Sequence, residues 1–284
     1  MWTILVPIDL TEQSQSIAVY ALELASDIIA KIEFCLVVEI PETIPMAGFM
    51  LWPSEDFSSS RDDAQQDMRK FMEEMYHYAA SIGRGHVPMD SLVELGTIND
   101  ILLNRTKVHH RPLLLIDFPP RMSSERYFKV SMAMHFFENT KVPVLMVPQS
   151  APYRKVKKVA LATNLSTTDI ETVHGLTMLF MANEPEILLV HVIDQNCAIG
   201  GLKKTTSDFL DMIGNRIDYR RIYYRQINGK NVHSGLEWLE INGYADVIAI
   251  VHGTGDVIPD PMDGSYTRKL AMTTSMPLLI LPRD

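Results

Sequence analysis

The residues best suited to chemistry in this 284-residue chain are His252 and the small residues that follow it, Gly253, Gly255, Gly264 and Ser265. Glycine has no Cβ, so the backbone amides of such a segment can approach an anion closely. Imidazole titrates near neutral pH, so His252 could contact a phosphate or serve as an acid or base. A lone histidine is a weak signal for catalysis, so His252 alone does not define a site.

Sequence patterns typical of other chemistry are missing. The nine histidines form no His-Glu-x-x-His pair, and no group of Cys and His has the spacing of a metal site. There is no Gly-x-Ser-x-Gly turn and no Walker loop, and neither Cys35 nor Cys197 has an identifiable base partner. We therefore predict no metal site, no catalytic residues and no enzyme activity. The pair His109 and His110 is expected in a solvated loop.

Composition and charge argue against several classes of protein. Hydrophobic residues make up 46% of the chain and charged residues 21%, which is typical of globular proteins. The net charge of -9, without long runs of one sign, disfavours nucleic acid as a partner. The N-terminus lacks the basic segment of a signal peptide, and no apolar run approaches the roughly 18 residues of a membrane span. We therefore expect no membrane contact. Cys35 and Cys197 lie in apolar segments that are typical of buried strands, so we expect a reducing compartment, the cytoplasm.

The chain contains an internal repeat, and the shared segments fall at two offsets. At an offset of 155 (164 − 9), the matching segments are Ile4 to Thr11 with Val159 to Ser166, and Phe34 to Glu39 with Leu189 to Asp194. At an offset of 134 (247 − 113), they are Leu113 to Ile116 with Val247 to Ile250, and Val142 to Pro148 with Met276 to Pro282. The first copy therefore carries 21 (155 − 134) extra residues. We predict two domains, 1–152 and 153–284, called here the first and second copy.

Within each copy, short apolar runs alternate with longer segments of helical period. This pattern is typical of a parallel sheet with helices on both faces. One helical stripe, with Thr11 or Ser14 as its N-cap, consists of Ile17, Ala21, Leu24, Ala25 and Ile28. A methionine-rich stripe from Met68 to Ile82 is interpreted as core. Right-handed crossovers place all strand C-termini along one edge of the sheet.

The first copy opens with a strand, a Pro-x-Asp segment and a cap residue (Ile4 to Thr11), and it closes on an apolar strand (Lys141 to Pro148) that returns as Ser275 to Pro282. This unit resembles the universal stress protein family, over nearly the whole chain except residues 44–65. The resemblance implies two α/β domains, each with a five-stranded parallel sheet flanked by helices, of the adenine nucleotide alpha hydrolase-like type. It also implies internal pairing of the two domains through their last strands, a homodimer as a further option, and in many members an ATP at the strand C-termini.

In ATP-binding members of the family, a loop of pattern Gly-x2-Gly-x9-Gly-Ser holds the phosphates. The second copy matches this in part through Gly253, Gly255, Gly264 and Ser265, with each spacer one residue short. The first copy has Phe118-Pro119-Pro120-Arg121 at the equivalent place and Val130 instead of the third glycine, and its two prolines lack amide donors. The resemblance therefore implies ATP, accompanied by magnesium, in the second copy only.

The resemblance carries over further binding positions. The family places a carboxylate near the nucleotide at the position of Asp9, but in a copy without a phosphate loop a capping role is favoured for Asp9. Asn164 holds this position in the second copy. Asn164 could hydrogen-bond adenine or ribose, but it is also a normal turn residue. Val192 holds the position whose main chain contacts adenine in the family, and its alternative is a core valine. Together with Ala162, Thr163 and His252 these residues complete the predicted cofactor site.

The extra segment of the first copy, around residues 44–65, contains an apolar stretch from Ile44 to Pro53. It could be a lid, a docking patch for a partner, or a loop packed on its own domain. Three functions thus remain open. The first is a noncatalytic stress-response protein with adenine nucleotide in the second copy. The second is a scaffold without nucleotide whose loop 44–53 binds an unknown protein partner or an apolar ligand. The third, supported by fold analogy alone, is an enzyme that acts on an adenylated intermediate.

Overall fold

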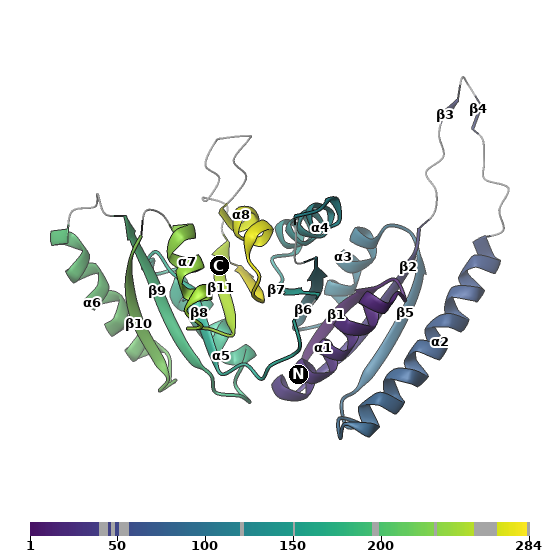
Figure 1. Ribbon diagram of the computed structural model, residues 1–284, viewed down its shortest axis with the longest axis horizontal. Helices are drawn as coiled ribbons and strands as arrows, with labels where there is room; N and C mark the ends of the chain where they lie inside the picture. Colours follow the sequence, from purple (N-terminus) through teal and green to yellow (C-terminus); the bar gives the residue numbers. More distant parts are fainter. Residues whose placement is uncertain are drawn as a thin grey trace. The chain divides into compact units, whose positions relative to one another are not determined.

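The computed structural model describes residues 1–39, 45–46, 49–50, 57–119, 122–149, 151–194, 199–229, 232–252 and 266–282. The chain divides into two compact units, Met1–Leu115 and Ile116–Asp284, called here the N-terminal and the C-terminal unit. Figure 1 shows the helices and strands of each unit.

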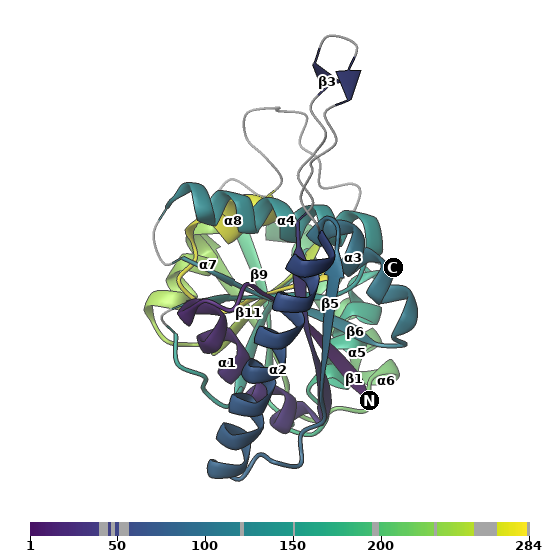
Figure 2. The same cartoon turned by 90° about the vertical axis from the view of Figure 1, so that its right-hand side faces the viewer.

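The N-terminal unit is a parallel sheet with the strand order β6-β1-β2-β5. Its elements are β1 (Trp2–Ile8), α1 (Glu12–Ile28), β2 (Ala30–Val38), the short antiparallel pair β3 (Pro45–Met46) and β4 (Phe49–Met50), α2 (Phe57–Ser81), β5 (Met89–Leu95), α3 (Ile98–Val108) and the first four residues of β6 (Pro112–Phe118). Successive side chains of a strand point to opposite faces of the sheet. Phe34 of β2 contacts Phe71 of α2 edge to face, whereas the preceding residue, Glu33, bonds to Arg105 of α3. The helices α2 and α3 therefore cover opposite faces of the sheet (Figure 2).

The C-terminal unit has the strand order β10-β9-β8-β11-β12-β7-β6. Its elements are the rest of β6, α4 (Ser124–Thr140), β7 (Val144–Pro148), β8 (Lys158–Ala162), α5 (Asp169–Leu179), β9 (Glu186–Asp194), α6 (Ile199–Arg216), β10 (Ile222–Gly229), α7 (Val232–Ile241), β11 (Val247–His252), α8 (Tyr266–Thr273) and β12 (Leu278–Pro282). The strands of the second copy pair in parallel. The last strands of the two copies, β7 and β12, pair antiparallel, with Met146 opposite Leu278 and Val144 opposite Ile280. The predicted fold class is confirmed.

The backbone repeats what the sequence repeats. The strands β7 and β12 have equal lengths and lie 134 residues apart (278 − 144). At the other offset (165 − 10 = 155), Leu10 and Leu165 both adopt a left-handed conformation, with φ of 61° and 64°. A leucine rarely adopts this conformation, so its occurrence at equivalent positions indicates that both copies need the same sharp turn after their first strand.

The compact units do not follow the repeat. Sequence similarity places the boundary between residues 152 and 153, whereas the units meet between residues 115 and 116. The last part of the first copy groups with the second copy because β7 pairs with β12 and α4 contacts α8. Similarity and packing measure different properties of the chain, so the division into 1–152 and 153–284 stays a prediction.

The predicted helical stripes are buried. Thr11 is the N-cap of α1, and its side chain accepts a hydrogen bond from the backbone N–H of Ser14. The methionine-rich stripe lies along α2, where Met68, Met72 and Met75 are less than a tenth exposed, in agreement with its interpretation as core. The end of the extra segment is not a loop, because α2 already begins at Phe57. The apolar stretch 44–53 lies outside the described residues apart from the backbone of β3 and β4, so its role as lid, patch or packed loop stays untested.

Candidate functional site

The predicted site centres on the carboxyl ends of β9, β8 and β11, which are neighbours in the sheet. Ala162 is the last residue of β8, His252 the last of β11, and Val192 lies two residues before the end of β9. Both neighbours run parallel to β8, so their ends meet at one edge. The remaining predicted residues, Gly253, Gly255, Gly264 and Ser265, lie outside the described residues, as does the side chain of His252.

Asn164 forms the turn that follows β8. Its Oδ1 accepts a hydrogen bond from the backbone N–H of Ser166 at 3.0 Å, as expected of a turn residue. The backbone N–H of Leu165 donates to Thr163 Oγ1 at 2.9 Å, and this hydroxyl donates to Asp169 Oδ2 at 2.7 Å. Asn164 is exposed, and an amide side chain also has two donor hydrogens, so the turn leaves it able to contact a ligand.

The first copy makes the same turn with a carboxylate in place of the amide. Asp9 Oδ1 accepts from the backbone N–H of Thr11 at 3.1 Å, from Thr11 Oγ1 at 2.6 Å and from Ser14 Oγ. Asp9 therefore serves the turn and the start of α1, which is the capping role favoured by the sequence.

The two copies carry a carboxylate at different positions of this turn and the helix that follows it. Asp169 occupies the position of Ser14 (169 − 14 = 155), and the neutral Asn164 occupies that of Asp9. In the second copy the carboxylate is on the helix, has 0% exposure and accepts from Thr163, whereas in the first copy it is exposed on the turn. The exposed strand end of the second copy therefore carries a neutral amide at this position.

Val192 is held between its strand and a helix. An added Cβ at Gly235 of α7 would lie only 2.6 Å from Val192 Cγ2, so α7 approaches β9 closely at this point. This contact agrees with the interpretation of Val192 as a packed valine, and it leaves the main-chain role of Val192 toward adenine as a prediction.

His191 belongs to this strand end and was not predicted as a site residue. Its Nδ1 lies 3.0 Å from the backbone carbonyl oxygen of Thr163. A carbonyl only accepts, so Nδ1 carries the hydrogen and Nε2 is the acceptor in the neutral ring. The signal in the sequence was a titratable residue inside the apolar run of β9, where a polar side chain needs a partner.

The strand end of β6 in the first copy holds a nearly buried carboxylate. Asp117 is 5% exposed, and its Oδ1 pairs with Lys129 Nζ at 2.5 Å. Its Oδ2 accepts from Gln149 Nε2 at 2.8 Å. The ammonium of Lys129 and the amide of Gln149 compensate this carboxylate, as a nearly buried charge requires.

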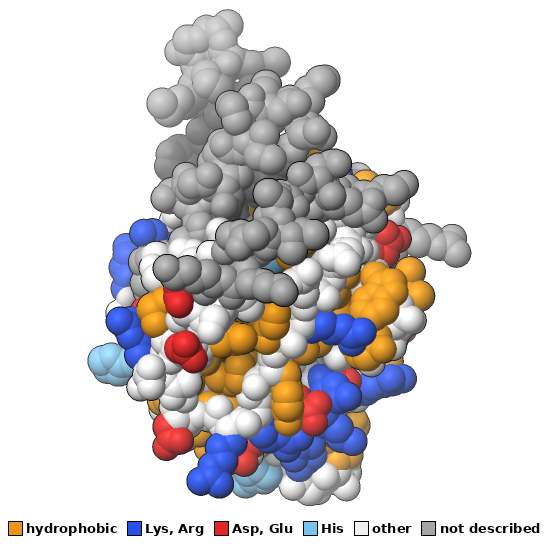
Figure 3. Space-filling view, turned by 90° about the vertical axis from the view of Figure 1, so that its left-hand side faces the viewer, with side chains coloured by type: hydrophobic (Ala, Val, Ile, Leu, Met, Phe, Trp, Pro, Cys, Tyr) orange, Lys and Arg blue, Asp and Glu red, His pale blue; other side chains and the backbone are white. Residues whose placement is uncertain are grey.

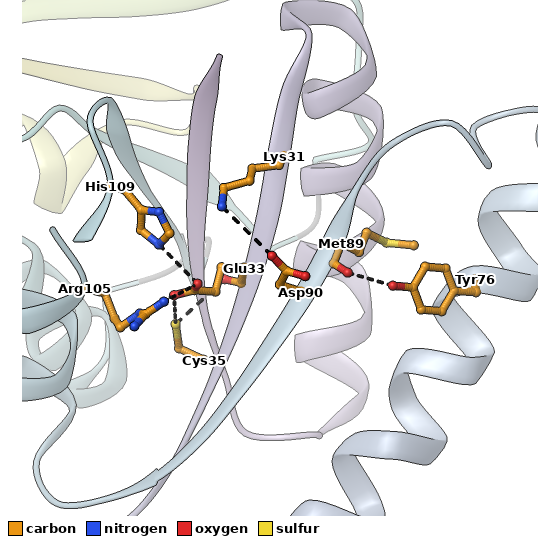
Figure 4. Close-up of polar contacts among 8 residues, drawn as sticks. All are labelled: Lys31, Glu33, Cys35, Tyr76, Met89, Asp90, Arg105 and His109. Carbon is orange, nitrogen blue, oxygen red and sulfur yellow. Dashed lines mark hydrogen bonds and ion pairs between the residues drawn. The ribbon is translucent and has the colours of Figure 1, made fainter.

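A second polar cluster lies within the N-terminal unit, on the α3 face of its sheet (Figure 4). Arg105 of α3 binds Glu33 of β2 through two bonds, Nε to Oε1 at 2.6 Å and an Nη to Oε2 at 2.7 Å. His109 Nε2 lies 3.1 Å from Glu33 Oε2. Burial alone would raise the pKa of Glu33, but the hydrogen bond and charge of Arg105, aided by His109, outweigh it and hold the pKa below its ordinary value.

The surroundings of Glu33 correct the expectation that His109 is solvated, and they account for the raised pKa of Cys35. The side chain of His109 is only 7% exposed and contacts Glu33, so it is not solvated, whereas His110 is exposed. Glu33 required such partners because a carboxylate inside an apolar strand is costly to bury alone. Burial, with the charge of Glu33, raises the pKa of Cys35 to about 12, so this thiol is protonated at neutral pH.

A groove of about 650 Å³ adjoins the cluster and runs past Arg69, Glu73, Tyr76 and Asp90. Tyr76 Oη donates to the carbonyl of Met89 at 2.7 Å, and Lys31 lies 4.0 Å from Asp90 (Figure 4). The described lining of the groove holds three carboxylates and two guanidinium groups, and one of these, that of Arg105, is already paired with Glu33. We interpret this cluster as structural.

Two features are absent from the described part of the chain. No group of three or more His, Cys, Asp or Glu side chains in that part of the chain could hold a metal ion. No helix in that part is long and apolar enough to cross a membrane.

Solved structures with the same architecture extend over the entire chain. A universal stress protein from Archaeoglobus fulgidus superposes with a TM-score of 0.65 at 14% identity, covering 99% of this chain and 96% of that one. The chain has the universal stress protein fold. A protein from Pseudomonas aeruginosa assigned to the universal stress proteins gives 0.59 at 9% identity, covering 100% of this chain and 93% of that one.

The universal stress protein fold is not tied to one function. The cytoplasmic domain of a prokaryotic cation chloride cotransporter also superposes, with a TM-score of 0.52 at 11% identity, covering 99% of this chain and 95% of that one. No family model and no curated protein matches the sequence. Likeness at this level of identity establishes the fold, and the function has to be argued from the site.

Proposed function

We propose that the chain is a noncatalytic, cytoplasmic tandem universal stress protein that binds ATP with magnesium in its second copy only. The observation that supports this proposal is that only the second copy keeps glycines after its fourth strand. The first copy has Phe118-Pro119-Pro120-Arg121 at that place, and Val130, which stands in the position of Gly264, is buried in α4 with 1% exposure. In the second copy, the exposed Asn164 can still donate a hydrogen bond to adenine or ribose.

The donors at the second strand end suit a nucleotide. Asn164 is exposed and supplies amide hydrogens, and the sequence adds Gly253, Gly255, Gly264 and Ser265 after β11 for the phosphates. The described residues at this edge offer no cluster of carboxylates for a divalent cation. We therefore propose that magnesium binds as its complex with ATP, through phosphate oxygens, and not at a separate site formed by protein side chains.

The proposal is tested by the substitution Gly264→Val, which copies the residue found at Val130. A valine side chain would occupy the space where backbone and phosphate should touch, so the affinity for ATP should fall at least about tenfold, or about 1.4 kcal/mol. Calorimetric titration of the full-length protein with ATP and magnesium measures this.

Gly175→Val is the matched control, because it makes the same change in α5, where an added Cβ meets nothing within 4 Å. It should leave the affinity unchanged. Equal affinity in wild type and Gly264→Val would move the nucleotide elsewhere. Absence of ATP binding in the wild type would favour the scaffold function without nucleotide.

A further inference from the structure

A groove on the second copy has features of a ligand site that the nucleotide proposal does not use. It has a volume of about 620 Å³ and lies between the C-terminal half of β10 and the N-terminal half of α7. Small-molecule sites usually have volumes of roughly 300–1,000 Å³. Figure 3 looks onto the side of the molecule that carries α6 and β10, and it shows hydrophobic side chains gathered next to Lys and Arg side chains.

Arg225 stands at this groove on an aromatic platform. The rings of Trp238 and Tyr244 stack with centroids 5.1 Å apart and planes 19° apart. The guanidinium carbon of Arg225 lies 4.3 Å from the centroid of the Tyr244 ring and 4.9 Å from that of Trp238. Stacking on the two rings restricts the guanidinium to a fixed plane, so its N–H groups are oriented before any ligand binds.

The guanidinium lacks an acidic partner in the part of the chain that the structure describes. The ion pairs there involve Arg84, Arg105, Arg221, His109 and four lysines, and none of them reaches Arg225. Among the described residues that line the groove, none is acidic and Arg225 alone is basic. A planar cation oriented at a groove of net charge about +1 is suited to a monoanion with two coplanar oxygens.

The other residues that line the groove indicate the body of the ligand. Trp238 is 37% exposed, so part of its ring is accessible for stacking. Ile227 contributes an apolar side chain to the lining, and Gly235 contributes backbone without a side chain. The amide of Asn228 can form polar contacts with a ligand. We propose that this groove binds a small organic carboxylate with a planar apolar body, with Arg225 pairing with the carboxylate and Trp238 contacting the body.

The test uses 2-naphthoate as the probe and the indole N–H signal of Trp238 in nuclear magnetic resonance spectra of the full chain. The chain has three tryptophans, so the signal is assigned with Trp238→Phe, and the other two serve as internal references. We expect the Trp238 signal to shift with a dissociation constant of about 1 mM or lower, as is reasonable for a ligand of this size. No shift at several times that concentration would overturn the proposal.

Two variants separate the role of Arg225 from that of general surface charge. Arg225→Gln should weaken 2-naphthoate binding at least about tenfold, with its fold checked by thermal unfolding. Arg221→Gln removes a nearby arginine that is paired with Glu186, and it should leave binding unchanged. Arg225→Lys keeps the charge on a more flexible side chain and should bind with intermediate affinity. Equal affinity in Arg225→Gln and wild type would refute the role of Arg225.

Two analogues test the class of ligand. The neutral 2-naphthamide should bind at least about tenfold more weakly than 2-naphthoate, because it cannot form the charged pair. If it binds equally well, the groove is an apolar surface and the proposal fails. If 2-naphthyl phosphate binds at least about tenfold more tightly than the carboxylate, the assignment to carboxylates is wrong.

Discussion

Replacing Arg126 with alanine is expected to lower the free energy of unfolding by about 3 to 5 kcal/mol. Arg126 is only 1% exposed, although it carries a charge. Its guanidinium donates to the carbonyl oxygens of Ala271 at 2.9 and 3.2 Å, of Thr274 at 2.6 Å and of Pro119 at 3.0 Å, and it lies 4.3 Å from the ring centroid of Phe118.

Two physical effects add up in this substitution. The carbonyls of Ala271 and Thr274 lie at the C-terminal end of α8, where no helical N–H is available to them and where the helix dipole favours a cation. Alanine would leave these acceptors unsatisfied in the interior and would leave a cavity next to Phe118. Since Arg126 belongs to the first copy and α8 to the second, this one side chain joins elements that are 145 residues apart in the sequence.

Chemical denaturation of the full chain measures this effect. Arg126→Lys should fall between wild type and Arg126→Ala, because an ammonium can replace some of the four bonds but not all of them. Arg154→Ala, at an exposed arginine, should change the stability by about 0.5 kcal/mol or less. If Arg126→Ala costs no more than this control, the buried guanidinium does not stabilise the C-terminal unit.

Glu33→Gln is expected to lower the free energy of unfolding by about 2 to 4 kcal/mol at neutral pH. The substitution leaves Arg105 and His109 facing a neutral amide, although the partial exposure of Arg105 (23%) lets water solvate part of the lost charge. Asp90→Asn is the matched control, because the Asp90 carboxylate is 69% exposed and lies 4.0 Å from Lys31. It should change the stability by about 0.5 kcal/mol or less.

The effect of Glu33→Gln should depend on pH in a defined direction. The pKa of Glu33 is lower in the folded protein than its ordinary value of 4.5, so its ionised form is favoured by folding. This contribution is complete above that value and is lost as the pH falls through the lowered folded pKa. The difference in stability between wild type and Glu33→Gln should therefore be largest near neutral pH and shrink below pH 4.5. A difference that grows on acidification would mean that Glu33 is not held ionised by Arg105.

The fold could be predicted because local hydrophobic patterns and the internal repeat both indicate it. Continuous apolar runs predict the parallel strands, and the offset of 134 relates the sequence of β7 to that of β12. The grouping of residues 116–149 with the second copy could not be predicted in the same way. It depends on contacts such as Arg126 with Ala271, which join distant segments and leave no periodic signal.

The sequence predicts which strand ends form the candidate site, but it does not predict which side chains interact there. Ala162, Asn164 and Val192 lie at or next to the ends of the neighbouring strands β8 and β9, and their role in binding stays a prediction. The interaction of His191 with Thr163, like that of His109 with Glu33, depends on which face of a strand meets which helix or loop. A single sequence indicates that a polar residue within an apolar run needs a partner, but it does not indicate which partner.

The central claim is that one copy binds adenine nucleotide and the other does not, and the number of ATP molecules bound per chain tests it most directly. Calorimetric titration of the full-length protein with ATP in the presence of magnesium gives this number. The prolines that replace the glycine loop of the first copy and the buried Val130 in the position of Gly264 predict one ATP per chain. Two ATP molecules per chain would show that the first copy also binds without these glycines, and none would show that the second copy is not a nucleotide site.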